Sequence, residues 1–114
     1  MPCIQLNVST KLTDAAKVAI KTKLGKAIEC VPGKSENWLM VTMRDDVTVY
    51  FKGDDSKPAA FVAVGVYGGA DASAFDALTG KICDILGCEA GISSDRIYVQ
   101  YTATPYWGWN GGNF

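Results

Sequence analysis

Apolar residues recur at spacings of three and four after residue 13, which is the pattern of one face of an α-helix. The stripe consists of Ala16, Ile20, Leu24, Ala27 and Val31. Thr13 or Asp14 can cap the start of this helix, and Pro32 followed by Gly33 ends it. The lysines of the segment fall between the apolar positions, so we expect them on a solvated helix face.

A second stripe with the same helical spacing follows residue 71. It consists of Phe75, Leu78, Ile82, Ile85 and Leu86. Asp71 or Ser73 can cap the helix, and Gly87 or Gly91 can end it. Gly80 weakens its middle, because glycine has a low helix propensity. We therefore expect two amphipathic helices.

Five short stretches are rich in β-branched and aromatic residues and read as β-strands. They are residues 3–8, 37–44, 47–51, 59–67 and 96–101. The stretch 59–67, AAFVAVGVY, is apolar throughout, so we expect a central strand that is buried on both faces. The remaining tail, 102–114, holds four aromatic residues among Pro, Gly and Asn turn residues.

The order of the elements repeats. The first long strand is followed by a helix and a strand some 35 residues on, and the strand at 59 is followed in the same way after 37 residues. This is an internal repeat of layout, not of residue identity. Two β-α-β units that share one sheet, with both helices on one face, are the simplest product. We expect a single α+β domain over residues 1–114, although a ferredoxin-like module has the same alternation.

Composition narrows the class of protein. With 11 basic and 12 acidic residues the net charge is −1, which argues against a dedicated nucleic-acid binder. A mean hydropathy of +0.08 is high for a soluble chain of 114 residues and fits burial against further copies. No apolar run approaches the ~18 residues of a membrane span. The first residues lack a basic region and a continuous apolar run, so we expect no signal peptide and a cytoplasmic protein, with export by another route left open.

The sequence lacks histidine, and its four cysteines form no CxxC pair. A zinc site is therefore not expected, and Ser–His and Cys–His catalysis are excluded. We expect no metal site. The cysteines are expected to be buried free thiols that pack as small hydrophobic side chains. They are Cys3, Cys30, Cys83 and Cys88.

Several local sequences resemble the macrophage migration inhibitory factor and D-dopachrome tautomerase family, in order and along the whole chain. They are MPCIQLNVS at the start, VPGK at 31–34, SKPAAF at 56–61, SSDRIYVQY at 93–101 and GWNGGNF at 108–114. The resemblance implies the tautomerase fold, a four-stranded mixed sheet with two helices on one face, and a homotrimer with an active site at each subunit interface. It implies keto–enol tautomerisation of small aromatic acids, phenylpyruvate-like or dopachrome-like, without a cofactor.

Pro2 is the catalytic base that the resemblance implies, provided that Met1 is removed. A tautomerase takes a proton from carbon, which needs a base with a pKa near the working pH. An α-amino group titrates at about 7.7 to 8, and a nearby cation or an apolar environment lowers that pKa. With Met1 attached, the nitrogen of Pro2 is an amide and is not basic. Without the resemblance, Pro2 would be interpreted as the start of an edge strand.

The resemblance also implies residues that bind the substrate. Lys34 aligns with a lysine that attracts the substrate carboxylate. Tyr98 matches a tyrosine near the catalytic proline, and Gln100 replaces an asparagine of the animal proteins. Tyr98 and Gln100 are two apart on one strand and so share a face. Aromatic side chains in an apolar site can wall a pocket for a phenyl ring. The candidates for this wall are Trp38, Trp107, Trp109 and Phe114.

Two departures from the family pattern change the expectations. Tyr67 stands where the family has an aliphatic residue whose backbone amide meets the ligand, so its ring is expected to narrow the pocket. Animal members carry a CxxC motif where this chain has Ala59 and Val62, so their thiol redox activity is not expected.

Two alternatives to an enzyme remain. Animal members are also secreted cytokines, so the chain is alternatively a signalling protein that binds a cell-surface receptor and has a vestigial tautomerase site. A ferredoxin-like RNA-binding module would need exposed aromatic residues on a basic sheet. The apolar run 59–67 and the charge of −1 argue against that module.

Overall fold

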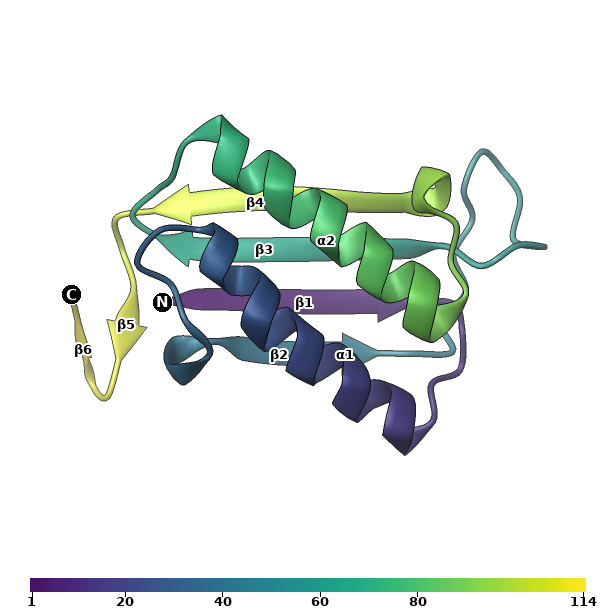
Figure 1. Cartoon of the computed structure of the whole chain (residues 1–114), viewed down its shortest axis with the longest axis horizontal. Helices are drawn as coiled ribbons and strands as arrows, with labels where there is room; N and C mark the ends of the chain where they lie inside the picture. The colour runs from purple at the N-terminus through teal and green to yellow at the C-terminus, as the bar shows by residue number, and fades with distance from the viewer.

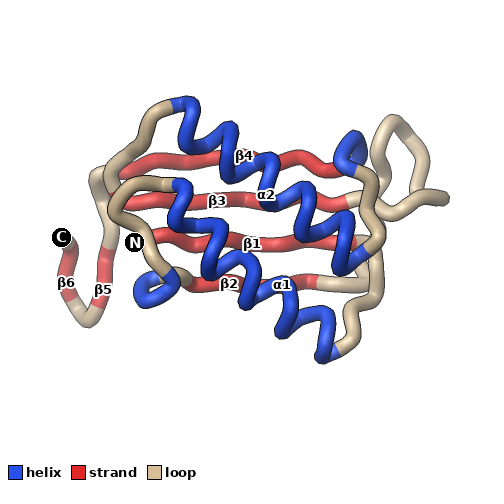
Figure 2. Tube along the Cα trace, in the orientation of Figure 1, coloured by secondary structure: helices blue, strands red, loops and turns tan.

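The computed structural model describes residues 1–114 and contains one four-stranded sheet, two long helices and a small C-terminal hairpin. The sheet strands are β1 (Pro2–Val8), β2 (Met40–Arg44), β3 (Ala60–Tyr67) and β4 (Ile97–Thr104). The helices are α1 (Asp14–Ala27) and α2 (Ala72–Ala90), with the short 3-10 helices η1 (Ile28–Cys30), η2 (Glu36–Trp38) and η3 (Ser94–Arg96). Strands β5 (Gly108–Trp109) and β6 (Gly112–Asn113) form the hairpin. Both long helices cover the same face of the sheet (Figure 1, Figure 2).

The strand order β2-β1-β3-β4 confirms the predicted pair of β-α-β units. β1 and β2 are parallel, β3 and β4 are parallel, and the units meet through the antiparallel pair β1 and β3. The sheet is therefore mixed, and each helix connects two parallel strands. In this arrangement the start of β1 lies at the same end of the sheet as the end of β3, since Pro2 pairs with Val66.

The core lies between the sheet and the helices. Alternate residues of β1 and β3 point toward the helices, and the apolar stripes of the helices meet them, as the periodicities predict. Burial of each large aliphatic side chain contributes about 1.5–3 kcal/mol. Those that are almost fully buried include Ile4, Leu6, Val8, Ile20, Leu24, Val62, Val64, Val66, Leu78, Ile82 and Leu86.

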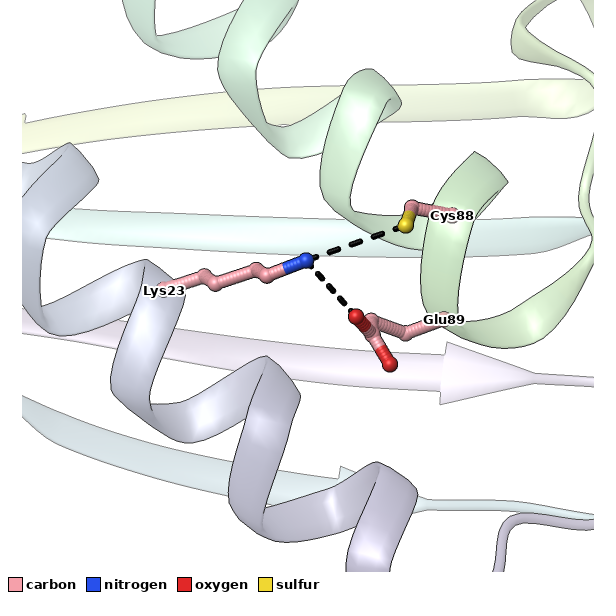
Figure 3. Close-up of polar contacts among 3 residues, drawn as sticks. All are labelled: Lys23, Cys88 and Glu89. Atoms are coloured by element: carbon pink, nitrogen blue, oxygen red, sulfur yellow. Dashed lines mark hydrogen bonds and ion pairs between the residues drawn. The ribbon is translucent and has the colours of Figure 1, made fainter.

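Three of the four helix ends agree with the predicted signals, whereas α1 ends at Ala27 and continues only as η1 to Cys30, before the predicted stop at Pro32 and Gly33. Thr13 is the N-cap of α1, and its hydroxyl oxygen accepts a hydrogen bond from the amide of Ala16 over 3.1 Å. α2 runs through Gly80 and ends at Gly91, whose φ of 67° is the left-handed conformation that glycine adopts at low cost. Between the helices, the ammonium of Lys23 lies 2.6 Å from a carboxylate oxygen of Glu89 and 3.7 Å from the sulfur of Cys88 (Figure 3). No helix is long and apolar enough to cross a membrane.

The strand predicted at 47–51 is wrong, and the one predicted at 37–44 is shorter than expected. Residues 36–38 form η2, so β2 starts only at Met40. Both neighbouring positions beside β1 are already taken by β2 and β3, so the β-branched stretch 47–51 cannot pair with β1. Positive φ angles of 56° at Asp46 and 55° at Lys52 bend the backbone on either side, and Phe51 forms only an isolated bridge with Asp54.

The prediction that 59–67 is buried on both faces is also wrong for the single chain. β3 is a central strand, but its side chains alternate between buried and partly exposed. The sheet face opposite the helices, called the open face below, carries no covering layer (Figure 2). Large side chains lie exposed on it: Met40 is 63%, Tyr98 64% and Phe61 38% accessible.

The four cysteines are free, as predicted, but none is fully buried. Cys3, Cys30 and Cys83 are half-buried, and Cys88 is exposed at the surface of α2. Cys83 and Cys88 belong to a helix whose buried stripe is formed by other residues, so the expectation of buried thiols is wrong. Burial raises the pKa of the Cys3 and Cys83 thiols above the usual value.

Candidate active site

The N-terminal segment is fixed against the end of β3. Pro2 is the first residue of β1, a position that suits proline because it has no backbone N–H to donate to a ladder. Its side chain is buried. The amide of Tyr67 donates a hydrogen bond to the carbonyl oxygen of Met1 over 2.9 Å. The nitrogen of Pro2 is therefore held at one end of the sheet, beside the residue that ends β3.

Lys34 reaches the same point from the loop after α1. A positive φ of 79° at Gly33 turns the chain there, and the amide of Lys34 donates to the carbonyl oxygen of Val31 over 3.1 Å. The ammonium of Lys34 then donates to the carbonyl oxygen of Tyr67 over 2.8 Å. The cation predicted from the VPGK segment thus lies next to the chain terminus.

The electrostatics of this corner favour a neutral amine. In the chain that carries Met1, the terminal amine is that of Met1. Burial, followed by the positive charge of Lys34 and a hydrogen bond with its side chain, lowers the pKa of that amine. A cation close to a partly buried amine penalises the protonated form, which is the direction that a general base needs.

Four aromatic residues lie around the terminus: the candidates Trp38, Trp109 and Phe114, and Tyr67. Trp38 meets Trp109 edge-on, with ring centroids 5.2 Å apart. The rings of Trp109 and Phe114 are nearly parallel at 6.3 Å, and Phe114 packs against Tyr67 at 5.4 Å. A cavity of about 260 Å³ lies among them. It is lined by Met1, Gly33, Trp38, Tyr67 and Phe114.

The C-terminal hairpin supplies two of these rings, and a tight turn fixes its shape. Asn110 and Gly111 have φ angles of 52° and 86°, so the two-residue loop has the positive φ values of a tight hairpin turn. The amide of Phe114 donates to the carbonyl oxygen of Trp107 over 3.0 Å and closes the hairpin. The hairpin lies beside the N-terminus (Figure 1).

A larger cavity of about 770 Å³ adjoins the N-terminus on the side of β2. Met1, Pro2 and Trp38 line it together with Trp107 and several residues that the sequence did not indicate. These further residues are Cys3, Asn37, Leu39, Met40, Tyr106 and Gly108, and the candidate Trp109 completes the lining. Strand alternation places Met40 beside Cys3 in the β1–β2 register, but the register itself could not be predicted from the sequence.

Tyr98 and Gln100 do not belong to this corner within one chain. Both point to the open face, as their spacing predicted, and both are exposed. Tyr98 pairs with Phe61 at the start of β3, five residues from the Val66 that pairs with Pro2. At about 3.3 Å per residue, this puts Tyr98 roughly 16 Å from Pro2 along the strand direction, and Gln100, which pairs with Ala63, roughly 10 Å from it. A cavity at Pro2 can include Tyr98 only if another copy supplies it.

The corner thus combines a terminal amine, an adjacent cation and an aromatic wall. Nowhere in the chain do three or more His, Cys, Asp or Glu side chains lie close enough together to hold a metal ion. These groups can attract an acid through Lys34, hold an apolar group among the rings and exchange a proton at the amine.

Comparison with known proteins gives the class and then the family. The family model "Macrophage migration inhibitory factor (MIF)" matches residues 1–114. The solved structure of MIF2 from Leishmania major is 34% identical, with a TM-score of 0.93, over 100% of this chain and 97% of that one. The homologue from Prochlorococcus marinus is 27% identical, with a TM-score of 0.84, over 98% of each chain. A comparison with curated protein sequences gives no match.

The mixed sheet, its two helices on one face and the proline that opens β1 define the tautomerase fold. The chain belongs to the macrophage migration inhibitory factor family. The resemblance that the local sequences indicated is therefore confirmed.

Proposed function

We propose that this protein is a keto–enol tautomerase of phenylpyruvate-like acids, with the nitrogen of Pro2 as the general base after removal of Met1. The observation that carries the proposal is the position of Lys34. Its ammonium is bound to the carbonyl of Tyr67, whose amide holds the Met1 carbonyl, so one residue ties the cation to the chain terminus. Burial and this cation lower the pKa of an amine at that place.

The proposed reaction moves one proton from carbon to oxygen. Lys34 binds the substrate carboxylate, and the rings of Trp38, Trp109 and Phe114 receive its apolar group. The neutral amine of Pro2 takes the proton from the carbon next to the carbonyl group. The electron pair of that C–H bond forms the carbon–carbon double bond, and the π electrons of the carbonyl group move to its oxygen. That oxygen takes a proton from solvent water to give the enol, and protonated Pro2 releases its proton to solvent to restore the neutral amine. The reverse direction returns the proton from Pro2 to carbon.

Two further site residues, Tyr98 and Gln100, enter from a neighbouring copy. We propose a homotrimer that covers the open face, where Met40, Phe61 and Tyr98 are exposed. Apolar side chains gathered on an uncovered sheet face are typical of an interface. In a closed ring each copy offers one surface to the next, so the start of β4 of one chain can meet the N-terminal corner of another.

Retention of Met1 is the sharpest test. Met1 lines both cavities, so it occupies the space for the substrate and also makes the Pro2 nitrogen an amide. Loss of a positioned general base costs roughly 10²–10⁴ in rate. We expect the trimmed chain to tautomerise phenylpyruvate, the Met1 form to be nearly inactive, and trimmed Pro2→Gly to fall between, since glycine keeps an amine but loses the ring.

Each form is confirmed by intact mass before kcat/KM is measured by the absorbance of the enol. Equal activity with and without Met1 contradicts the role of Pro2. The second candidate, a signalling protein with a vestigial site, predicts no turnover by the trimmed chain and binding to a cell-surface receptor that does not depend on Pro2.

A further inference from the structure

Arg96 at the end of η3 holds the loop that precedes β3. Its guanidinium donates to three carbonyl oxygens: Nε to Pro58 over 3.0 Å, and Nη2 to Asp54 over 2.9 Å and to Lys57 over 3.1 Å. This loop connects β2 with β3 and projects from the end of the sheet opposite the N-terminus (Figure 1). A planar guanidinium can serve several carbonyls at fixed angles, which a lysine ammonium cannot reproduce.

The same guanidinium lies over the ring of Phe51. The carbon at its centre is 5.3 Å from the ring centroid, which is within the range of a cation–π contact. Phe51 belongs to the turn that its bridge with Asp54 closes, and Arg96 binds the carbonyl oxygen of Asp54. Arg96 therefore fixes both the backbone of this turn and the ring that the turn carries.

Phe51 in turn meets the ring of Tyr98. The two centroids are 5.2 Å apart and the planes are 78° from each other, an edge-to-face arrangement. Tyr98 is 64% accessible and lies on the open face, beside its register partner Phe61. Phe51 is thus placed to restrain the orientation of the Tyr98 ring.

We propose that Arg96 and Phe51 are positioning residues for catalysis, which hold Tyr98 in the orientation that it needs in the active site of a neighbouring copy. This inference rests on the proposed function, in which Tyr98 completes that site. Arg96 acts two contacts away from the substrate: it orders the turn, the turn presents Phe51, and Phe51 orients Tyr98. Loss of any one link lets the Tyr98 ring rotate away from the reacting acid.

A double-mutant cycle in the trimmed chain tests the link. Arg96→Lys keeps the charge but loses the fork, and Phe51→Ala removes the ring, so each is expected to lower kcat/KM for phenylpyruvate about 10-fold. In a Tyr98→Ala background, the same changes are expected to alter kcat/KM less than 2-fold, because there is no ring left to position. Phe51→Tyr keeps the edge-to-face contact and, unlike Phe51→Ala, is expected to retain wild-type activity.

Lys52→Gln is the matched control. The ammonium of Lys52 is also near the Phe51 ring, at 5.7 Å from its centroid, but it makes no hydrogen bond to the turn. We expect it to change kcat/KM less than 2-fold. If Arg96→Lys lowers activity equally with and without the Tyr98 ring, or not at all in the wild-type background, the positioning role is wrong.

A second readout does not depend on activity. In NMR spectra, the ring protons of Tyr98 are expected to shift when Phe51→Ala or Arg96→Lys removes or moves the neighbouring ring, and to stay in place in Lys52→Gln. Unchanged Tyr98 signals in Arg96→Lys overturn the inference even if the enzyme is active. Conversely, a trimmed wild-type chain without turnover overturns the proposed function, whatever the ring signals show.

Discussion

The ammonium of Lys34 donates to the carbonyl oxygen of Tyr67 over 2.8 Å, and the amide of the same Tyr67 binds the carbonyl of Met1 over 2.9 Å. Both contacts use the main chain of Tyr67, so the link between the cation and the chain terminus does not depend on the side chain at position 67. The Tyr67 ring remains available to shape the cavity against Phe114.

Replacement of Lys34 by alanine should raise KM for phenylpyruvate more than it lowers kcat. The lysine is proposed to hold the carboxylate equally in the ground state and the transition state, and loss of such uniform binding appears in KM. We expect KM to rise roughly 10-fold or more, a loss of about 1.4 kcal/mol. Steady-state kinetics of the trimmed chain measure it, and an unchanged KM would show that Lys34 does not bind the carboxylate.

The terminal amine of the Met1 form should titrate below the 8.0 usual for an α-amine, because burial and then Lys34 lower its pKa. Lys34→Ala should move the midpoint only part of the way back, since burial is the larger cause. The rate of amine acetylation against pH measures the midpoint in the wild-type chain and in the variant.

The unfolded chain binds the proton of the terminal amine more tightly than the folded chain, so the unfolding free energy should rise with pH up to about 8 and then level off. A midpoint at 8 in the folded chain would contradict this.

The thiols should differ in reactivity in a fixed order. Cys88 is exposed, whereas burial raises the pKa of Cys3 and Cys83 and leaves less thiolate for reaction. Iodoacetamide at pH 8 should therefore label Cys88 first, as peptide mass spectrometry can show.

The chain should also fail to catalyse insulin reduction, because Ala59 and Val62 stand where the family's CxxC would be. Insulin reduction above a thiol-free control would contradict this expectation.

Association should depend on the open face. Three chains of 12.2 kDa give a particle of about 37 kDa in sedimentation at micromolar concentration. Phe61→Arg places a charge on the proposed interface and should yield the single chain. Val18→Arg is the matched control, because Val18 is also apolar and 57% accessible but lies on α1, on the helical side. A 12 kDa species from the wild-type chain, or equal effects of the two variants, would argue against the trimer.

The sequence predicted those features that depend on local periodicity. The helical stripes, the Thr13 cap and the Gly91 terminus are decided by neighbours within a few residues, so they could be predicted. The stretch 47–51 could not, because its β-branched residues have a strand's composition, while the positive φ angles of the flanking Asp46 and Lys52 leave no signal in that composition.

The candidate site also has parts that local motifs predict and parts that depend on long-range contacts. The VPGK loop and the aromatic tail could be assigned from local motifs, and they meet at the N-terminus. The spacing of Tyr98 and Gln100 shows that they share a sheet face, but only the register Phe61–Tyr98 shows how far along the strand they lie from Pro2. Met40 and Tyr106 were missed because their place in a cavity wall depends on long-range contacts with no local signal.

Two cations bracket β3. Lys34, after the first helix, binds a carbonyl at the end of this strand, and Arg96, after the second helix, binds carbonyls just before its start. Each half of the repeat thus ends its helical connection with a positive charge placed against main chain. Only one of the two places also has a chain terminus, since Pro58 lies in mid-chain where its nitrogen is bonded on both sides. The two halves of the layout therefore differ in what their cations bind: Arg96 binds a continuous backbone, whereas Lys34 lies beside the chain end, where removal of Met1 would leave Pro2 with a free amine.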